Sequence, residues 1–188
     1  MKKLVLALIA SLALMSTAQA DPQATLSYGN QKDNTTHVLS DVLLFDLKTK
    51  IYQHTDIDLL VINKTAVGTN LVTNRVEAGV TLTYPLDDMF SIYIRPSVGS
   101  KQKSGTNSVN YYTSEQGLKL NLPYNFVAGV GYYYREAFDP LNKDAYQEMR
   151  YSIGYNITPQ AKLAIGTFRY ISGYNPSTTY WAGYTHSF

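Results

Sequence analysis

Apolar and polar residues alternate with a period of two along most of the chain, as in a β-strand with one apolar face. The clearest run is TTYWAGYTHSF at the carboxyl terminus, where Tyr180, Ala182 and Tyr184 share one face. Six similar runs precede it at 70–84, 89–100, 109–122, 125–137, 145–157 and 161–171. Three less regular runs at 22–30, 39–48 and 56–63 raise the predicted number of strands to about ten, although eight or twelve would also fit.

The predicted strands are long, and the segments between them alternate in length. Soluble strands usually hold about five or six residues, whereas a tilted strand crossing a bilayer needs about nine to eleven. Short turns at 85–88, 123–124 and 158–160 alternate with longer polar segments at 101–108, 138–144 and 172–177. Short periplasmic turns and longer outer loops are typical of outer-membrane barrels. The pattern therefore predicts an all-β fold, a closed antiparallel up-and-down transmembrane β-barrel whose termini both face the periplasm.

The phase of the alternation predicts which side of each strand meets lipid. In 125–137 one face is apolar with aromatic ends, and the same phase continues on neighbouring strands. The predicted lipid-facing residues are Phe126, Ala128, Val130, Tyr132 and Tyr134; Phe90, Ile92, Ile94 and Val98; Met149, Tyr151, Ile153, Tyr155 and Ile157; and Val76, Ala78, Val80, Leu82 and Tyr84. Arg169 shares a face with Leu163 and Ile165, which requires a bulge or a position at the outer headgroups. A soluble barrel would turn its apolar face inward, but strand length and the flanking tyrosines favour lipid outside.

The first twenty residues read as a secretory signal. Two lysines, Lys2 and Lys3, are followed by an apolar run at 4–15 and then by small residues ending at Ala20. A run of twelve is too short for a membrane helix, which needs about 20 residues. We expect cleavage after Ala20, which leaves residues 21–188 as the barrel.

Composition then excludes several functions. Without the two signal lysines, the 16 basic residues of the whole chain fall to 14, equal to the 14 acidic residues, so nucleic-acid binding is not expected. The chain has no cysteine, which excludes disulfides and thiolate metal sites. No cofactor motif or metal-ligand spacing is present, and none is expected to be needed.

The last strand carries a resemblance to a known class. Its final residues Gly183, Tyr184, His186 and Phe188 place aromatic residues at alternate positions up to a terminal phenylalanine. Together with the signal and the repeated strands, this resembles the outer-membrane β-barrel proteins of Gram-negative bacteria, although His186 stands where an apolar residue is usual. The resemblance implies residence in the outer membrane, contact with its lipid and lipopolysaccharide, and recognition of the terminal aromatic by the barrel assembly machinery.

Once the lipid faces are assigned, charged and aromatic side chains are predicted to fill the lumen. We call the predicted charged set the charge belt: Arg75, Glu77, Arg95, Glu115, Lys119, Arg135, Glu148 and Arg150. The predicted lumenal aromatic residues are Tyr93, Tyr111, Tyr133, Tyr146 and Trp181. Asp46 and Asp58 also face the lumen if the irregular early strands keep the same phase. Arginines and charge rings suit a narrow porin-like channel for small polar, anionic or sugar-like solutes. The same residues would equally suit a plugged structural barrel, because lumenal charges must be paired.

Two other functions are alternatives to the channel. The outer loops could bind host or neighbouring molecules, although short loops offer little contact area. A lipid-modifying enzyme would need a nucleophile with a base, and none is evident: His186 and Ser187 are adjacent and point to opposite faces, while His54 and Asp56 fall at a predicted periplasmic turn. We therefore expect no enzymatic activity and, by default, a monomer.

Overall fold

The computed structural model describes residues 22–69, 71–142, 144–174 and 176–188. The predicted signal segment, 1–20, lies outside the described residues. The strands are β1 (Gln23–Asp33), β2 (Leu39–Tyr52), β3 (Thr55–Ala66), β4 (Val72–Pro85), β5 (Phe90–Lys103), β6 (Val109–Asn121), β7 (Phe126–Ala137), β8 (Tyr146–Thr158), β9 (Ala161–Gly173) and β10 (Ser177–Ser187). Each strand boundary lies within four residues of its predicted position, so the ten-strand prediction is confirmed.

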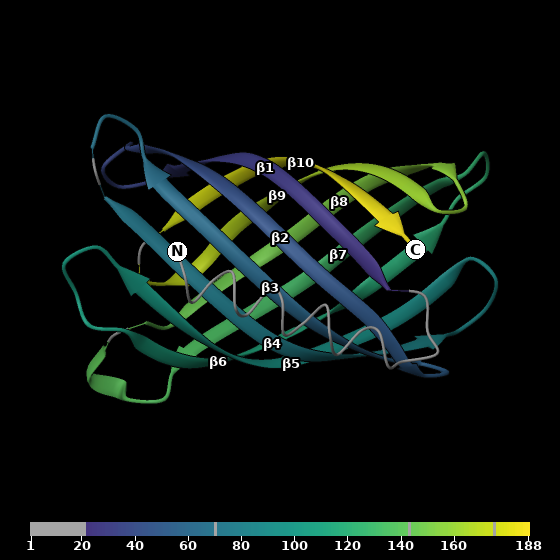
Figure 1. The fold of residues 1–188 in the computed structure, drawn as a ribbon, viewed down its shortest axis with the longest axis horizontal. Coiled ribbons are helices and arrows are strands. Elements are labelled where there is room, and N and C mark those ends of the chain that lie inside the picture. Colours follow the sequence, from purple (N-terminus) through teal and green to yellow (C-terminus); the bar gives the residue numbers. More distant parts are fainter. Residues whose placement is uncertain (1–21, 70, 143, 175) are drawn as a thin grey trace.

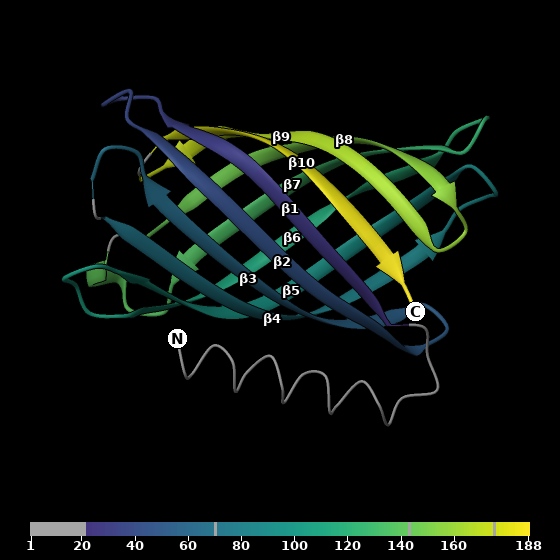
Figure 2. The same cartoon turned by 45° about the horizontal axis from the view of Figure 1, so that its top comes forward.

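The strands form one closed antiparallel barrel in which each strand pairs with its neighbours in sequence. Closure comes from β1 and β10, which pair along their whole length from Gln23↔Ser187 to Asp33↔Ser177. Figures 1 and 2 show these two strands, purple and yellow, side by side on the barrel wall. Because every edge is paired, backbone N–H and C=O groups need no solvent, which is the condition for crossing a bilayer with strands.

The two ends of the barrel differ. At the turn end, on the right of Figure 1, strands are joined by residues 53–54, 86–89, 122–125 and 159–160, and β1 begins and β10 ends there. At the loop end, strands are joined by 34–38, 67–71, 104–108, 138–145 and 174–176, with a 3-10 turn, η1 (Pro140–Asn142), in the longest loop. Among the residues that the structure describes, no helix has the length and apolarity to cross a membrane.

Side chains alternate as the sequence predicted. The aliphatic residues Leu82, Ile94 and Ile153 are 46%, 42% and 46% exposed on the outer wall, whereas inward neighbours such as Glu77 and Tyr133 are fully buried. A soluble barrel would show the reverse arrangement, so the apolar-out orientation is confirmed. Arg169 follows the same rule: it is exposed on the outer wall near the loop end, and the pairing of β9 with β10 is regular up to this residue.

Candidate functional site in the barrel lumen

Glu77 lies at the centre of the largest polar cluster in the lumen. It is fully buried, and Arg75 and Arg95 form ion pairs with its two carboxylate oxygens. The hydroxyl groups of Tyr111 and Tyr133 donate to Oε1 at 3.2 and 3.1 Å. Because strands β4 to β7 are neighbours, residues in the inward phase converge there from four consecutive strands. A buried carboxylate requires such pairing, and two arginines and two tyrosines supply it.

Asp58 extends this cluster to β3. Nε of Arg95 donates to its Oδ1 at 2.7 Å, Nη2 donates to the same oxygen, and the Thr81 hydroxyl donates to Oδ2 at 3.1 Å. We call Asp58, Arg75, Glu77 and Arg95 the central network. Glu115 lies opposite Arg95 in the β5–β6 ladder but is not part of the central network. It forms an ion pair with Arg150 instead. The uncertain inward phase of Asp58 is therefore resolved: this carboxylate faces the lumen.

A second cluster surrounds Arg150. Its Nη1 donates to Glu115 at 2.5 Å and its Nε to Glu148 at 2.8 Å. The guanidinium lies 3.8 Å from the ring centroid of Tyr133 and 4.7 Å from that of Phe168. We call Glu115, Glu148 and Arg150 the Arg150 network. Since Tyr133 also contacts Arg75, one buried aromatic side chain joins the two networks.

A third ion-pair cluster lies toward the loop end of the barrel. Asp144, buried in the β7–β8 loop, forms ion pairs with Lys101 at 2.5 Å and with Arg135 at 2.9 Å. The sequence assigned both 101–108 and 138–144 to outer polar loops; this assignment is wrong for Lys101, which lies in β5, whereas Asp144 does lie in a loop but is buried. β5 continues to Lys103, so Lys101 stays in the inward phase of Arg95, and Asp144 lies between the part-buried Lys101 and the buried Arg135. Lys101 is an even number of residues from Arg95, which could have indicated that it faces inward. Nothing in the sequence indicated the position of Asp144.

Lysines gather toward the turn end. Lys119 lies 5.0 Å from the ring centroid of Tyr93 and has no carboxylate within 4.0 Å in the described part of the chain. Lys48 pairs with Asp56 at 2.9 Å, and Lys162 shares the inward phase on β9. The predicted charge belt is thus distributed over three ion-pair clusters, with Lys119 beyond them toward the turns.

The lumen is not filled throughout. A cavity of about 260 Å³ lies between the networks and the wall formed by β1, β2 and β10. Its lining includes Asp46, Lys48 and Trp181 from that wall, with Lys119 from β6 and Phe168 from β9. Oδ1 of Asp46 and Nε1 of Trp181 are buried without a partner among the described residues. The indole packs over Gly166, where an added Cβ would come within 2.5 Å of the ring. Unpaired acceptor and donor atoms in one cavity can bind a polar guest.

The remaining predicted residues divide between the two faces. Tyr146 is buried, and its hydroxyl lies 3.0 Å from that of Ser177. On the outer face of β10, Tyr184 stacks with His186 at a centroid distance of 6.3 Å, and His186 meets Phe188 edge-on at 4.8 Å. Gly183, which directly precedes Tyr184, is in the inward phase. The aromatic row thus faces outward, and its role as an assembly signal stays a prediction.

Comparison with known proteins shows the fold. No protein-family model and no curated protein matches the chain. Among solved structures, it is similar to an outer-membrane channel from Pseudomonas putida F1 (TM-score 0.60, 8% identity, covering 90% of this chain and 96% of that one). It is also similar to the NanC porin (0.56, 9%, covering 88% and 100%) and to the KdgM porin in complex with disordered oligogalacturonate (0.51, 11%, covering 87% and 99%). The chain therefore has the architecture of outer-membrane β-barrels.

Proposed function

We propose that this barrel is a narrow outer-membrane channel for small polar or anionic solutes. The observation that carries the proposal is the lumenal cavity, which brings Lys48, Lys119 and the aromatic pair Phe168 and Trp181 into one water-accessible lining. Lysines attract carboxylates and phosphates, while aromatic faces and unpaired polar atoms suit hydroxylated solutes. The turn end and both termini face the periplasm in this proposal.

The choice of anionic solutes is based on the charged side chains of the lumen. The KdgM porin is described as holding oligogalacturonate, an acidic oligosaccharide, in a barrel of similar fold. At 11% identity that likeness concerns the fold alone. Anionic solutes are proposed here because Lys119 and Lys162 project toward the turn end with no carboxylate within 4.0 Å among the described residues, whereas the arginines are neutralised by their networks.

A plugged structural barrel is the second candidate, and one observation favours it. Glu77, Tyr111 and Tyr133 are fully buried, and Asp144 ties the longest loop to the wall. An eight-stranded barrel is just filled by side chains, whereas porins with open channels have about sixteen strands. A ten-stranded barrel with clusters of this size can be closed over part of its length.

Conductance in planar bilayers separates the two candidates. The wild type should conduct and favour anions in a salt gradient. Arg150→Ala removes the guanidinium between Glu115 and Glu148, so conductance should rise and the reversal potential should move toward cation selectivity. Arg169→Ala is the matched control, since it removes an arginine from the outer wall and should leave both quantities unchanged. Silence in both the wild type and Arg150→Ala, with folding verified, would reject the channel.

A further inference from the structure

The outer face of β6 differs from the rest of the barrel wall. Its outward residues are Asn110, Tyr112, Ser114, Gln116, Leu118 and Leu120, of which only the last two are aliphatic. Neighbouring β5 presents Phe90, Ile92 and Ile94 over the same stretch of wall. A barrel in a bilayer normally carries an unbroken outward apolar band about 25 Å tall. Ser114 and Gln116 interrupt that band.

Gln116 lies well inside the hydrocarbon layer. It is six residues before the turn at 122–125, which places it about 14 Å from that end for a strand tilted by about 45°. Its ladder neighbours, Ile94 and Tyr132, are also outward residues. On the described part of β6, side-chain hydrogen bonds involve Tyr111, Tyr112, Thr113, Glu115 and Asn121, and none of these reaches Gln116. An amide without a partner in lipid is strongly unfavourable.

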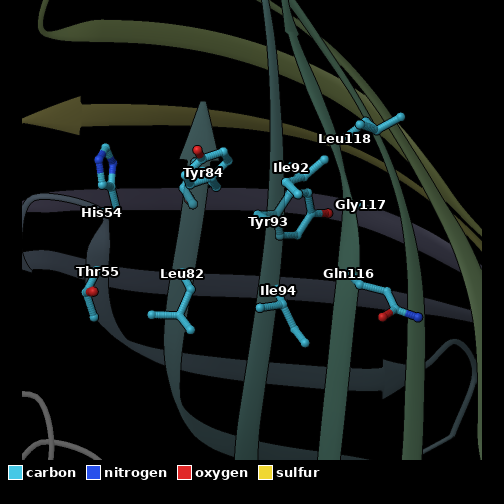
Figure 3. Close-up of a pocket in the computed structure, with 11 residues that line it drawn as sticks. His54, Thr55, Leu82, Tyr84, Ile92, Tyr93, Ile94, Gln116, Gly117 and Leu118 are labelled. Atoms are coloured by element: carbon cyan, nitrogen blue, oxygen red, sulfur yellow. The ribbon is translucent and has the colours of Figure 1, made fainter. Parts of the chain in front are cut away.

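A groove of about 570 Å³ adjoins this amide on the same wall. Leu82, Tyr84, Ile92, Ile94 and Leu118 line it together with Gln116, and His54 stands at its turn-end rim. Figure 3 shows Leu82, Ile94 and Gln116 in a row across three strands. Beyond this row, the β4–β5 pairing is interrupted between Gly79↔Ser97 and Leu82↔Ile94, where Pro96 has no N–H to donate.

We infer that this wall binds a second copy of the chain, in a two-fold interface centred on Gln116. In a symmetric pair of copies inserted in the same direction, the two-fold axis lies along the membrane normal, so each residue meets the partner copy at its own depth. An amide both donates and accepts, and two Gln116 side chains can therefore satisfy each other. Acyl chains could fill the apolar groove, but they offer the amide no hydrogen bond.

The same two-fold symmetry places side chains of the partner copy against the groove. Across a two-fold axis at β6, the β5 side of one barrel faces the β7 side of the other. The outward β7 side chains Val130 and Tyr132, which flank Leu118 and Gln116 in the ladder, then face the partner's groove over β4 and β5. Interhelical hydrogen bonds and close packing play the same role in helical membrane proteins, where apolar burial gives no advantage over lipid. This inference is independent of whether the lumen conducts.

Site-specific photocrosslinking tests the interface. A benzophenone amino acid is placed at Leu118, in the groove, or at Leu163, an outward leucine on β9 at a similar distance from its turn. Gln116 stays intact in both variants. Irradiation of outer membranes should give a covalent dimer of the chain from position 118 and none from position 163. Exclusive crosslinking of position 118 to lipid or to a different protein, or equal dimer formation from both positions, would overturn the proposal.

The amide itself is tested by Gln116→Leu. Losing two symmetric hydrogen bonds should weaken dimerisation about ninefold, at about threefold for each bond. The dimer fraction is measured by energy transfer between labelled copies in vesicles diluted with lipid. Gln147→Leu, the same change at an outward position on β8, is the control and should have no effect. An unchanged or tighter dimer in folded Gln116→Leu would show that the amide does not hold the interface.

Discussion

The ion pair between Arg95 and Asp58 should be a strong determinant of barrel stability. Two nitrogens of Arg95 donate to one carboxylate oxygen, and the exposed fractions of the two residues are only 9% and 7%. Arg95→Met keeps the apolar stem but leaves Asp58 with the Thr81 hydroxyl as its remaining side-chain partner among the described residues. Breaking one side of a buried pair costs about 3–5 kcal/mol. Because the lumen holds a cavity that water can enter, we expect the lower end, about 3 kcal/mol.

A double-mutant cycle isolates the pair. Asp58→Asn, Arg95→Met and the combined variant are unfolded with urea in lipid vesicles, and the fluorescence of Trp181, the one tryptophan of the sequence, reports the transition. The coupling free energy should be about 2 kcal/mol, as expected for hydrogen bonds between charged groups. The control is Lys48 with Asp56, a pair nearer the turn end with side-chain exposures of 22% and 17%, for which about 0.5 kcal/mol is expected. A central coupling no larger than that of the control would refute this account of the lumen.

Three further predictions concern orientation, packing and processing. A membrane-impermeant maleimide should label Thr106→Cys on intact cells but Asp88→Cys only after the outer membrane is opened, and the reverse pattern would invert the proposed topology. Gly117→Ala should destabilise the barrel by about 1–3 kcal/mol or more, because its Cβ would lie 2.2 Å from a backbone oxygen of Val130. Gly129→Ala, which meets only the Ser152 hydroxyl within 3.5 Å, should melt near the wild type. Mass spectrometry of the membrane-inserted protein should give a chain that begins after Ala20, and an intact 1–20 segment would contradict the predicted signal.

The strands were predictable because two independent constraints act on them. A strand in a barrel wall must alternate, and a strand that crosses a bilayer must be long, so length and period together identified the seven strands from 70 onward. The inward phase of Arg95 and Arg150 followed because outward positions on their strands, such as Ile94 and Ile153, are apolar. Early strands were less clear, and only the contact with Arg95 placed Asp58 in the lumen.

Which charges pair with which could not be predicted from the inward phase alone. Arg95 and Glu115 face each other in the ladder, yet each binds a partner on a different strand. Long side chains reach across the lumen, and barrel shear decides which partner is near. The conformation of the loops could not be predicted either. Asp144 lies outside the alternating strands, and its ion pairs depend on how the β7–β8 loop is folded. The polar outer face of β6 could not be assigned by the same rule, because Ser114 and Gln116 interrupt the apolar row that identifies a lipid-facing side.

The uneven filling of the lumen connects these observations. Strands β4 to β8 contribute arginines, glutamates and tyrosines that meet one another near the axis, whereas the inward residues of β1, β9 and β10 include Ser27, Gly166 and Gly183. Ten strands enclose more space than side chains of average size fill, and the small residues concentrate the free space on one side, where the cavity lies. A solute moving through the barrel would therefore follow the wall of small residues, past Trp181, and leave the central network intact. On this arrangement the ion pairs hold the barrel's shape. Arg95 and Arg150 also line the cavity but are paired with carboxylates, so among the described residues Lys119 is the cation of the lining that has no carboxylate within 4.0 Å.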